Sequence, residues 1–172
     1  MPAAPSFVCK HAPGKASRHH AFNDVVARAF SSAGVPVVKE PAGLCCTDGK
    51  RPDRMTLIPW KAGKRFVWDV TAICTTALPY IDSSTREAGA AAEIAATRKT
   101  ANYSSLSSQH TFYPIAVETL GPLNENVHLL LSDLGRCISA ASGDLREVSV
   151  LFQRISVVVQ RFNAVLFIII YY

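Results

Sequence analysis

Two aspartates, Asp53 and Asp69, are the residues most able to do chemistry in this chain of 172 residues. The segment between them reads as a strand, a tight glycine-containing turn and a second strand, which predicts one β-hairpin over residues 53–73. If the turn centres near Lys61 or Ala62 with an odd number of loop residues, the two carboxylates share a face, roughly 5–8 Å apart. Carboxylates that close repel each other, and a divalent cation between them relieves the repulsion. The hairpin therefore predicts a metal site on a sheet.

Other elements must hold this hairpin in a core, and one domain is expected for a chain of this length. Hydrophobic spacing, caps and turn residues predict helices over 18–32, 84–103, 124–141 and 144–162, with further strands over 35–40 and 111–118. Ser84 and Glu87 have the spacing of a capping box at the start of the second helix. The expected organisation is a flexible lead-in over 1–17, a core over 18–122, a helical extension over 123–165 and an apolar tail over 166–172.

The positive charge of the chain is concentrated in the half that holds the aspartates. The net charge is +5, and residues 1–72 contain 11 of the 18 basic residues but only 5 of the 13 acidic ones. This distribution favours a polyanionic partner near the site; the alternative is an ordinary solvated basic surface. Five cysteines without a regular spacing indicate a reducing, intracellular setting. The apolar tail is shorter than the roughly 20 residues of a membrane span, so no membrane partner is expected.

Lys99 is a candidate third member of the site. It falls on the helical stripe of Ala92, Ala95, Ala96 and Tyr103, which is expected to face the sheet. A lysine that points inward is costly unless it meets carboxylates or phosphate. The alternative is a lysine at a helix end whose ammonium reaches water, where positive charge also suits the helix dipole.

Two metal-binding carboxylates and a lysine suit the hydrolysis of a phosphodiester. A metal ion polarises the phosphoryl oxygen and lowers the pKa of a bound water, and a lysine orients that water or neutralises developing charge. The backbone carbonyl of Val70, next to Asp69, is a candidate further oxygen ligand.

The order of these motifs resembles the PD-(D/E)xK, restriction-endonuclease-like nucleases. Pro52-Asp53 lies on one strand and Asp69 on the next, but Thr71 stands where the usual lysine of that family is found. The sequence is more similar to the restriction-like endonuclease domain at the C-terminus of some non-LTR retrotransposon reverse transcriptases, in which the lysine has moved to the following helix. The similarity covers roughly residues 9–165. It rests on an ordered series of segments: Arg18-His19-His20-Ala21-Phe22-Asn23-Asp24, Asp48-Gly49-Lys50-Arg51-Pro52-Asp53, Trp68-Asp69-Val70-Thr71, Arg98-Lys99 with Tyr103, Glu118-Thr119-Leu120-Gly121, and Gln153-Arg154 with Arg161 and Asn163.

This resemblance implies an α/β fold with a restriction-endonuclease-like core of helix, three strands, helix and strand, a central mixed sheet flanked by helices, and extra C-terminal helices. It implies Asp53 and Asp69 as ligands of Mg²⁺ or Mn²⁺, Lys99 as the catalytic lysine, and Tyr103 and Glu40 as supporting residues, with Glu40 a further candidate ligand. The implied activity is the nicking of target DNA that primes reverse transcription, inside the cell and in the nucleus. Element RNA and the reverse transcriptase portion of the parent protein are further expected partners. The expected DNA contacts are Arg18, Lys50, Arg51, Arg54, Lys64 and Arg98.

Other interpretations of the same residues remain open. The chain could be a catalytically decayed element fragment that retains only nucleic-acid binding, or a host protein that uses the fold for RNA or structural binding. Cys9 and His11, with His19 and His20, could bind zinc, but no Cys-x-x-Cys pair accompanies them. Arg154 and Arg161 share a helical face and are candidates either for contact with a DNA backbone or for a solvated stripe.

Overall fold

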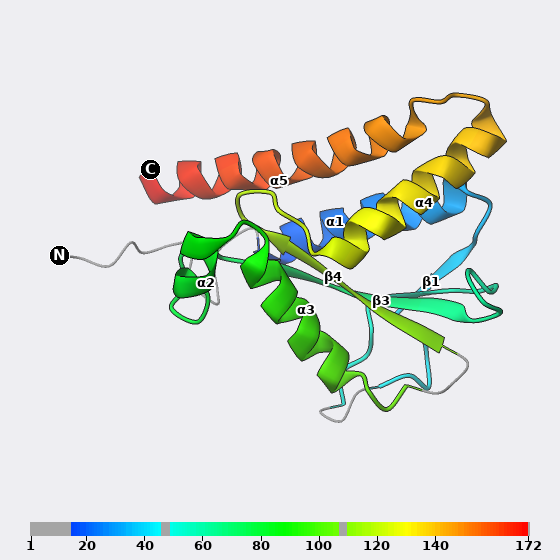
Figure 1. The fold of residues 1–172 in the computed structure, drawn as a ribbon, viewed down its shortest axis with the longest axis horizontal. Helices are drawn as coiled ribbons and strands as arrows, with labels where there is room; N and C mark the ends of the chain where they lie inside the picture. Colours follow the sequence, from blue (N-terminus) through cyan, green and yellow to red (C-terminus); the bar gives the residue numbers. More distant parts are fainter. Residues whose placement is uncertain (1–14, 46–48, 107–109, 172) are drawn as a thin grey trace.

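The computed structural model describes residues 15–45, 49–106 and 110–171, which contain five helices and four strands (Figure 1). In chain order these elements are α1 (Lys15–Ser32), β1 (Val37–Lys39), β2 (Arg54–Thr56), β3 (Arg65–Ile73), α2 (Ile81–Arg86), α3 (Ala90–Asn102), β4 (His110–Glu118), α4 (Glu125–Ser142) and α5 (Glu147–Tyr171). The first helix begins at Lys15 rather than at Arg18 as predicted, and the last helix runs further than the predicted end at Phe162.

The four strands form one mixed sheet in the order β1-β2-β3-β4. β1 pairs with β2 and β2 with β3 in antiparallel fashion, whereas β3 and β4 are parallel over nine residues. A parallel pair needs a crossover connection, and the segment with α2 and α3 supplies it. The α/β class and the mixed sheet with flanking helices are therefore confirmed.

Helices cover both faces of this sheet (Figure 1). Along β3 the side chains alternate, so that Phe66 and Trp68 pack in the large core with α1, α4 and α5. Ile73 packs on the other face with the alanines of α3. Trp68 is fully buried, and its ring stacks on that of Phe30 with 5.1 Å between centroids. Burial of each such side chain contributes roughly 1.5–3 kcal/mol to the stability of the fold, which holds β3 in position against the helices.

The helix predicted over residues 84–103 is two helices. Glu87 is extended (φ −151°, ψ 133°) at the end of α2, and Gly89 has a φ of 91°, in the left-handed region that favours glycine. The predicted capping box of Ser84 and Glu87 is therefore wrong. The N–H of Ala92 in the first turn of α3 instead donates to the carboxylate of Glu118 on β4, at 3.2 Å. A long-range acidic cap of this kind leaves no local sequence signal.

The two C-terminal helices belong to the same core as α1. Leu131 and Leu134 of α4 and Ile155 and Val159 of α5 are buried in the cluster that contains Trp68. The predicted helical extension over 123–165 therefore packs directly on the predicted core over 18–122. The predicted lead-in over 1–17 lies outside the described residues except for 15–17, which are helical, and the apolar tail begins within α5. No helix in the described ranges combines the length and apolar character that a membrane crossing requires.

Candidate active site

The two aspartates meet where β2 ends beside the middle of β3. The antiparallel register pairs Arg54 with Trp68, so Asp53 and Asp69 are the next residues beyond the last pair of the ladder, and the Val70 N–H bonds to Asp53 Oδ2. The sequence predicted both aspartates on paired strands, whereas β2 begins one residue after Asp53. Asp53 immediately precedes β2, so its side chain is held by neighbouring elements and not by the sheet alone.

Helix α1 holds the carboxylate of Asp53. His19 Nε2 lies 3.0 Å from Asp53 Oδ1, and Asn23 Nδ2 donates to Asp53 Oδ2 at 3.0 Å. Asn23 also accepts a 3.0 Å hydrogen bond from the indole N–H of the buried Trp68. Because His19 and Asn23 are four residues apart, they share one face of α1 and reach the same carboxylate. A chain of hydrogen bonds thus runs from the core to Asp53.

The β2–β3 ladder ends next to this point, at the pair of Arg54 and Trp68. Pro52 lies two residues before Arg54, and proline has no N–H with which to extend the ladder. The N–H of Val70 donates instead to Asp53 Oδ2 at 2.6 Å. The N–H and C=O of one strand residue point to the same side, so the Val70 carbonyl also faces the end of β2. A backbone oxygen therefore lies beside the two aspartates.

These contacts decide the ionisation of Asp53 and His19. Burial acts to raise the pKa of Asp53, but the hydrogen bonds from His19, Asn23 and the Val70 N–H outweigh it, so the pKa lies below its usual value. The hydrogen bond to Asp53 in turn raises the pKa of His19 above its usual value, against the opposing effect of burial. Asp53 is therefore a carboxylate at neutral pH.

Helix α3 holds the carboxylate of Asp69 from the other side of the sheet. Lys99 Nζ lies 2.8 Å from Asp69 Oδ2, and the Tyr103 hydroxyl donates to the same oxygen at 2.8 Å. The Asp69 side chain is 8% exposed and that of Lys99 28%, so this ion pair is largely shielded from water. The prediction that Lys99 lies within hydrogen-bonding reach of the aspartates is confirmed. Tyr103 is buried and stacks on Phe112, with 4.3 Å between ring centroids.

Asp69 is less easily ionised than Asp53. Burial, followed by the negative charge of Asp53, raises the pKa of Asp69 above its usual value, although Lys99 and Tyr103 act in the opposite direction. The two aspartates thus have pKa values displaced in opposite directions by their surroundings. Such a pair is common at functional sites, where two like charges share a small volume.

The residues present suit a hard divalent cation that keeps part of its water shell. Within the described ranges, no three His, Cys, Asp or Glu side chains converge as a closed metal site. Mg²⁺ usually binds through one or two carboxylates together with water and substrate phosphate, so Asp53, Asp69 and the Val70 carbonyl are the groups that could hold such an ion. Lys99 and Tyr103 both donate to Asp69 Oδ2. In the described part of the chain, the other oxygen, Oδ1, accepts no hydrogen bond.

Glu40 lies on the approach to Asp53. Its backbone N–H donates to the carbonyl of Asp53 at 2.8 Å, while its side chain is 59% exposed and lies 3.6 Å from Lys39 Nζ. Glu40 has a φ of 46°, which is unusual for a residue other than glycine. A hollow of about 230 Å³ opens here, lined by His19, His20, Asn23, Asp24, Lys39, Glu40, Asp53 and Arg54. Glu40 therefore borders the site without contacting the carboxylates through its side chain.

The predicted DNA contacts lie in different surroundings. Arg18 is only 7% exposed, and burial lowers the pKa of its guanidinium, so it is not a surface residue as expected. The Arg54 side chain is 18% exposed and pairs with Asp24 at 2.6 Å. Arg98 is exposed and lies over the ring of Tyr80. The residues with ordinary exposed side chains are Lys50, Arg51, Lys64, Arg154 and Arg161.

His19 and Asn23 have roles that were not assigned from the sequence. Both occur in the segment that carries the family resemblance, and their spacing of four on a helix was a signal for a shared face. Their common partner could not be read from the sequence, because Asp53 lies 30 or more residues away. The predicted zinc alternative depends on Cys9 and His11, which lie outside the described residues.

Comparison with known proteins adds no assignment to this geometry. No family model matches the sequence, and no curated protein matches it.

Proposed function

We propose that this chain is a metal-dependent DNA endonuclease domain with a restriction-endonuclease-like fold. The observation that carries the proposal is the convergence of three groups: Asp53, just before β2, lies beside Asp69 of β3, and Lys99 Nζ is 2.8 Å from Asp69 Oδ2. Strand β3 and the residue before β2 supply the two aspartates, and helix α3 supplies the lysine. The pKa of Asp53 is lowered and that of Asp69 is raised.

The order of elements supports the fold assignment. A helix, three antiparallel strands, a helical crossover and a strand parallel to the third make up the sheet and its first layers. Thr71 occupies the usual position of the lysine, two residues after the second acid, and Lys99 reaches the same carboxylate from α3. The ammonium group therefore comes from the crossover helix and not from the strand.

Each protein group has a definite task in this proposal. Asp53 is kept ionised by His19, Asn23 and the Val70 N–H, so it offers a negative charge at neutral pH. When bound, Mg²⁺ or Mn²⁺ supplies a polarised phosphoryl oxygen and a water of lowered pKa. Lys99 orients the attacking water or stabilises the charge that develops on the phosphate. Tyr103 fixes the carboxylate plane of Asp69 through its hydroxyl.

The substrate in this proposal is the DNA backbone, and the reaction is a nick that gives a primer end for reverse transcription. The basic excess in residues 1–72 and the exposed Lys50 and Arg51 support a polyanionic substrate. Element RNA and a reverse transcriptase portion are proposed partners on the basis of the family resemblance alone. On the same resemblance we propose a location inside the cell, in the nucleus.

A plasmid assay tests the proposal. We expect purified protein to nick supercoiled plasmid in the presence of Mg²⁺, and EDTA to stop the reaction. Asp53→Ala and Asp69→Ala are each expected to abolish nicking while DNA binding persists. Binding without cleavage by the unmutated chain would contradict the proposal and support the alternative of a decayed nucleic-acid-binding fragment.

A further inference from the structure

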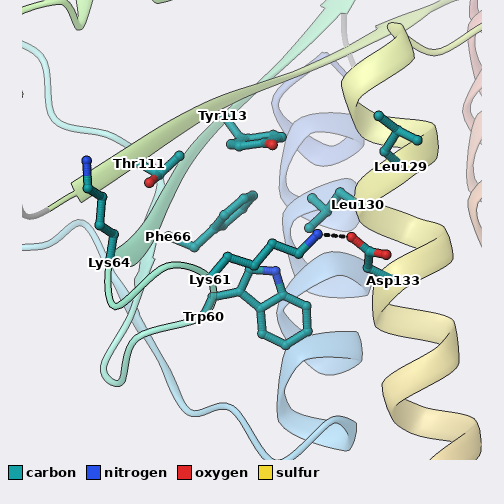
Figure 2. Close-up of a pocket in the computed structure, with 9 residues that line it drawn as sticks. All are labelled: Trp60, Lys61, Lys64, Phe66, Thr111, Tyr113, Leu129, Leu130 and Asp133. Carbon is teal, nitrogen blue, oxygen red and sulfur yellow. Dashed lines mark hydrogen bonds and ion pairs between the residues drawn. The ribbon is translucent and has the colours of Figure 1, made fainter.

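A second pocket lies at the N-terminal end of β3, whereas Asp69 lies in the middle of this strand. It has a volume of about 240 Å³ and opens between the β2–β3 turn, β4 and α4 (Figure 2). Phe66 lines it from the face of β3 that packs on α1 and α4, whereas Asp69, three residues further on, faces α3. Drug-sized ligands occupy pockets of roughly 300–1,000 Å³, so this pocket has room for one small ring system.

Aromatic rings form the sheet side of this pocket. Figure 2 shows Trp60, Phe66 and Tyr113 on that side and Leu129, Leu130 and Asp133 on α4. The rings of Phe66 and Tyr113 lie 4.7 Å apart between centroids. The indole of Trp60 is held in place by an edge contact with Phe30, at 5.2 Å. Rigid aromatic and leucine walls of this kind suit a flat ring.

One polar group in the wall lacks a partner. The indole Nε1 of Trp60 is buried and has no hydrogen-bond partner within the described part of the chain. An indole N–H is a donor only, and a buried donor that is left unpaired is unfavourable. Because this nitrogen is buried behind the surface of the wall, it is the face of the indole that a ligand in the pocket would meet.

The charges at the mouth favour an anion. Lys61 forms an ion pair with Asp133, which also pairs with Arg136. The carboxylate of Asp133 is thus already neutralised. Lys64, which also lines the pocket, is exposed and makes no ion pair in the described ranges. It leaves one positive charge beside an aromatic pocket.

We propose that this pocket binds one unpaired base of single-stranded DNA and that Lys64 contacts the adjoining phosphate. A nucleotide combines the two required features: a flat ring for the aromatic walls and a neighbouring negative charge for Lys64. A duplex offers no such base, because its rings are stacked and paired. The choice of DNA rests on the proposed function, since a strand opened near the cleavage site would supply the base.

The test measures binding without cleavage. In EDTA, fluorescence anisotropy compares a labelled oligothymidine, a strand of the same length with abasic positions, and a duplex. We expect the oligothymidine to bind at least about fivefold more tightly than either control, the usual effect of stacking one base on an aromatic side chain. It should also quench tryptophan fluorescence through Trp60, because Trp68 is fully buried.

Two variants assign the binding to the pocket. Lys64→Ala, at an exposed position, should weaken oligothymidine binding by about fivefold, and Trp60→Phe should weaken it while keeping a ring in the wall. Arg146→Ala removes a similar charge from the exposed α4–α5 connection and should change affinity less than twofold. Equal affinity for the thymidine and abasic strands would overturn the proposal. The proposal would also be overturned if Lys64→Ala and Arg146→Ala weakened oligothymidine binding equally. It would be overturned too if an RNA strand bound more tightly than the oligothymidine, or if an acidic tyrosine-containing peptide displaced the oligothymidine.

The outcome is separable from that of the nuclease proposal. Because this experiment measures binding in EDTA, where no cleavage occurs, a chain that never nicks plasmid can still show oligothymidine binding in the pocket. Conversely, if the chain nicks plasmid but binds the oligothymidine and abasic strands equally, the nuclease proposal is supported and the pocket proposal is overturned.

Discussion

Lys99 on α3 donates a 2.8 Å hydrogen bond to Asp69 on β3, thirty residues earlier in the chain. The bond joins the helix that covers one face of the sheet to the strand that carries the second acid. Asp53, which lies beside Asp69, is held from α1 on the other side of the sheet. The positions of the two aspartates therefore depend on both α1 and α3, and a substitution in either helix should alter the site.

Asp69→Asn should increase stability at neutral pH while abolishing nicking. Burial and the charge of Asp53 raise the pKa of Asp69, so its ionised form is unfavourable in the folded protein. The amide keeps an acceptor for Lys99 and Tyr103 without the charge. We expect a gain of about 0.5–2 kcal/mol in the free energy of unfolding, measured by urea denaturation at pH 7.

The pH dependence of that gain checks its cause. As the pH falls through the raised pKa of Asp69, the wild-type carboxyl takes up a proton and the penalty disappears, so the difference between variant and wild type should shrink. A gain that is the same at pH 4 and pH 7 would contradict the electrostatic explanation.

Asn23→Ala should destabilise the fold by about 1–3 kcal/mol. The change leaves the buried indole N–H of Trp68 without an acceptor and removes one donor from Asp53. Urea denaturation measures the loss, and Asn102→Ala at an exposed position of α3 is the matched control. If both variants lose the same small amount, the link between Trp68 and Asp53 is not stabilising.

Divalent cations should stabilise the protein more at pH 8 than at pH 5.5. The pKa values of His19 and Asp69 are both raised, so acid adds a positive charge beside Asp53 and a proton to Asp69. Both changes oppose a cation. The rise in Tm with Ca²⁺, which avoids turnover, measures the effect. His19→Gln keeps a donor for Asp53 but cannot become charged, so its pH dependence should be shallower; an unchanged slope would exclude His19 as a contributor.

Gly135→Ala tests the crossing of α4 and α5. A Cβ at this position would lie 2.6 Å from Val148 Cα, which is backbone and cannot rotate away. Overpacking costs about 1–3 kcal/mol, more than the roughly 1 kcal/mol that alanine gains over glycine in a helix. We expect a net loss in the free energy of unfolding, with exposed Cys137→Ala as the control. Val148→Ala should not restore stability, since the Val148 Cα remains; full rescue would contradict the close approach of the two helix backbones as the cause.

The pair of aspartates could be predicted from the sequence because a hairpin is a local structure. The strands lie close in the chain, and their register follows from the residues between them. Lys99 was also within reach of sequence reasoning, since the alanines of α3 define the buried face of that helix. In both cases periodicity alone fixes which way a side chain points.

The remaining features depend on contacts between distant segments. Glu118 caps α3 from β4, so the break at Gly89 has no complete local signal. His19 and Asn23 meet Asp53 only after α1 has packed on the sheet. Arg18 was expected at the surface, but it lies on the core side of α1 with Phe22. A charge-based prediction cannot detect burial of this kind, because the packing of α1 determines it.

The most direct test of the central claim is the rate of plasmid nicking by Lys99→Met at saturating Mg²⁺ and DNA. Methionine keeps the length of the side chain and removes the ammonium group that lies 2.8 Å from Asp69. Arg86→Met, at an exposed position of α2 on the chain between the same two strands, removes an equivalent charge as the control. We predict a rate about 100-fold or more below wild type for Lys99→Met and an unchanged rate for Arg86→Met. A Lys99→Met rate within about threefold of wild type would contradict the assignment of Lys99 to the catalytic centre.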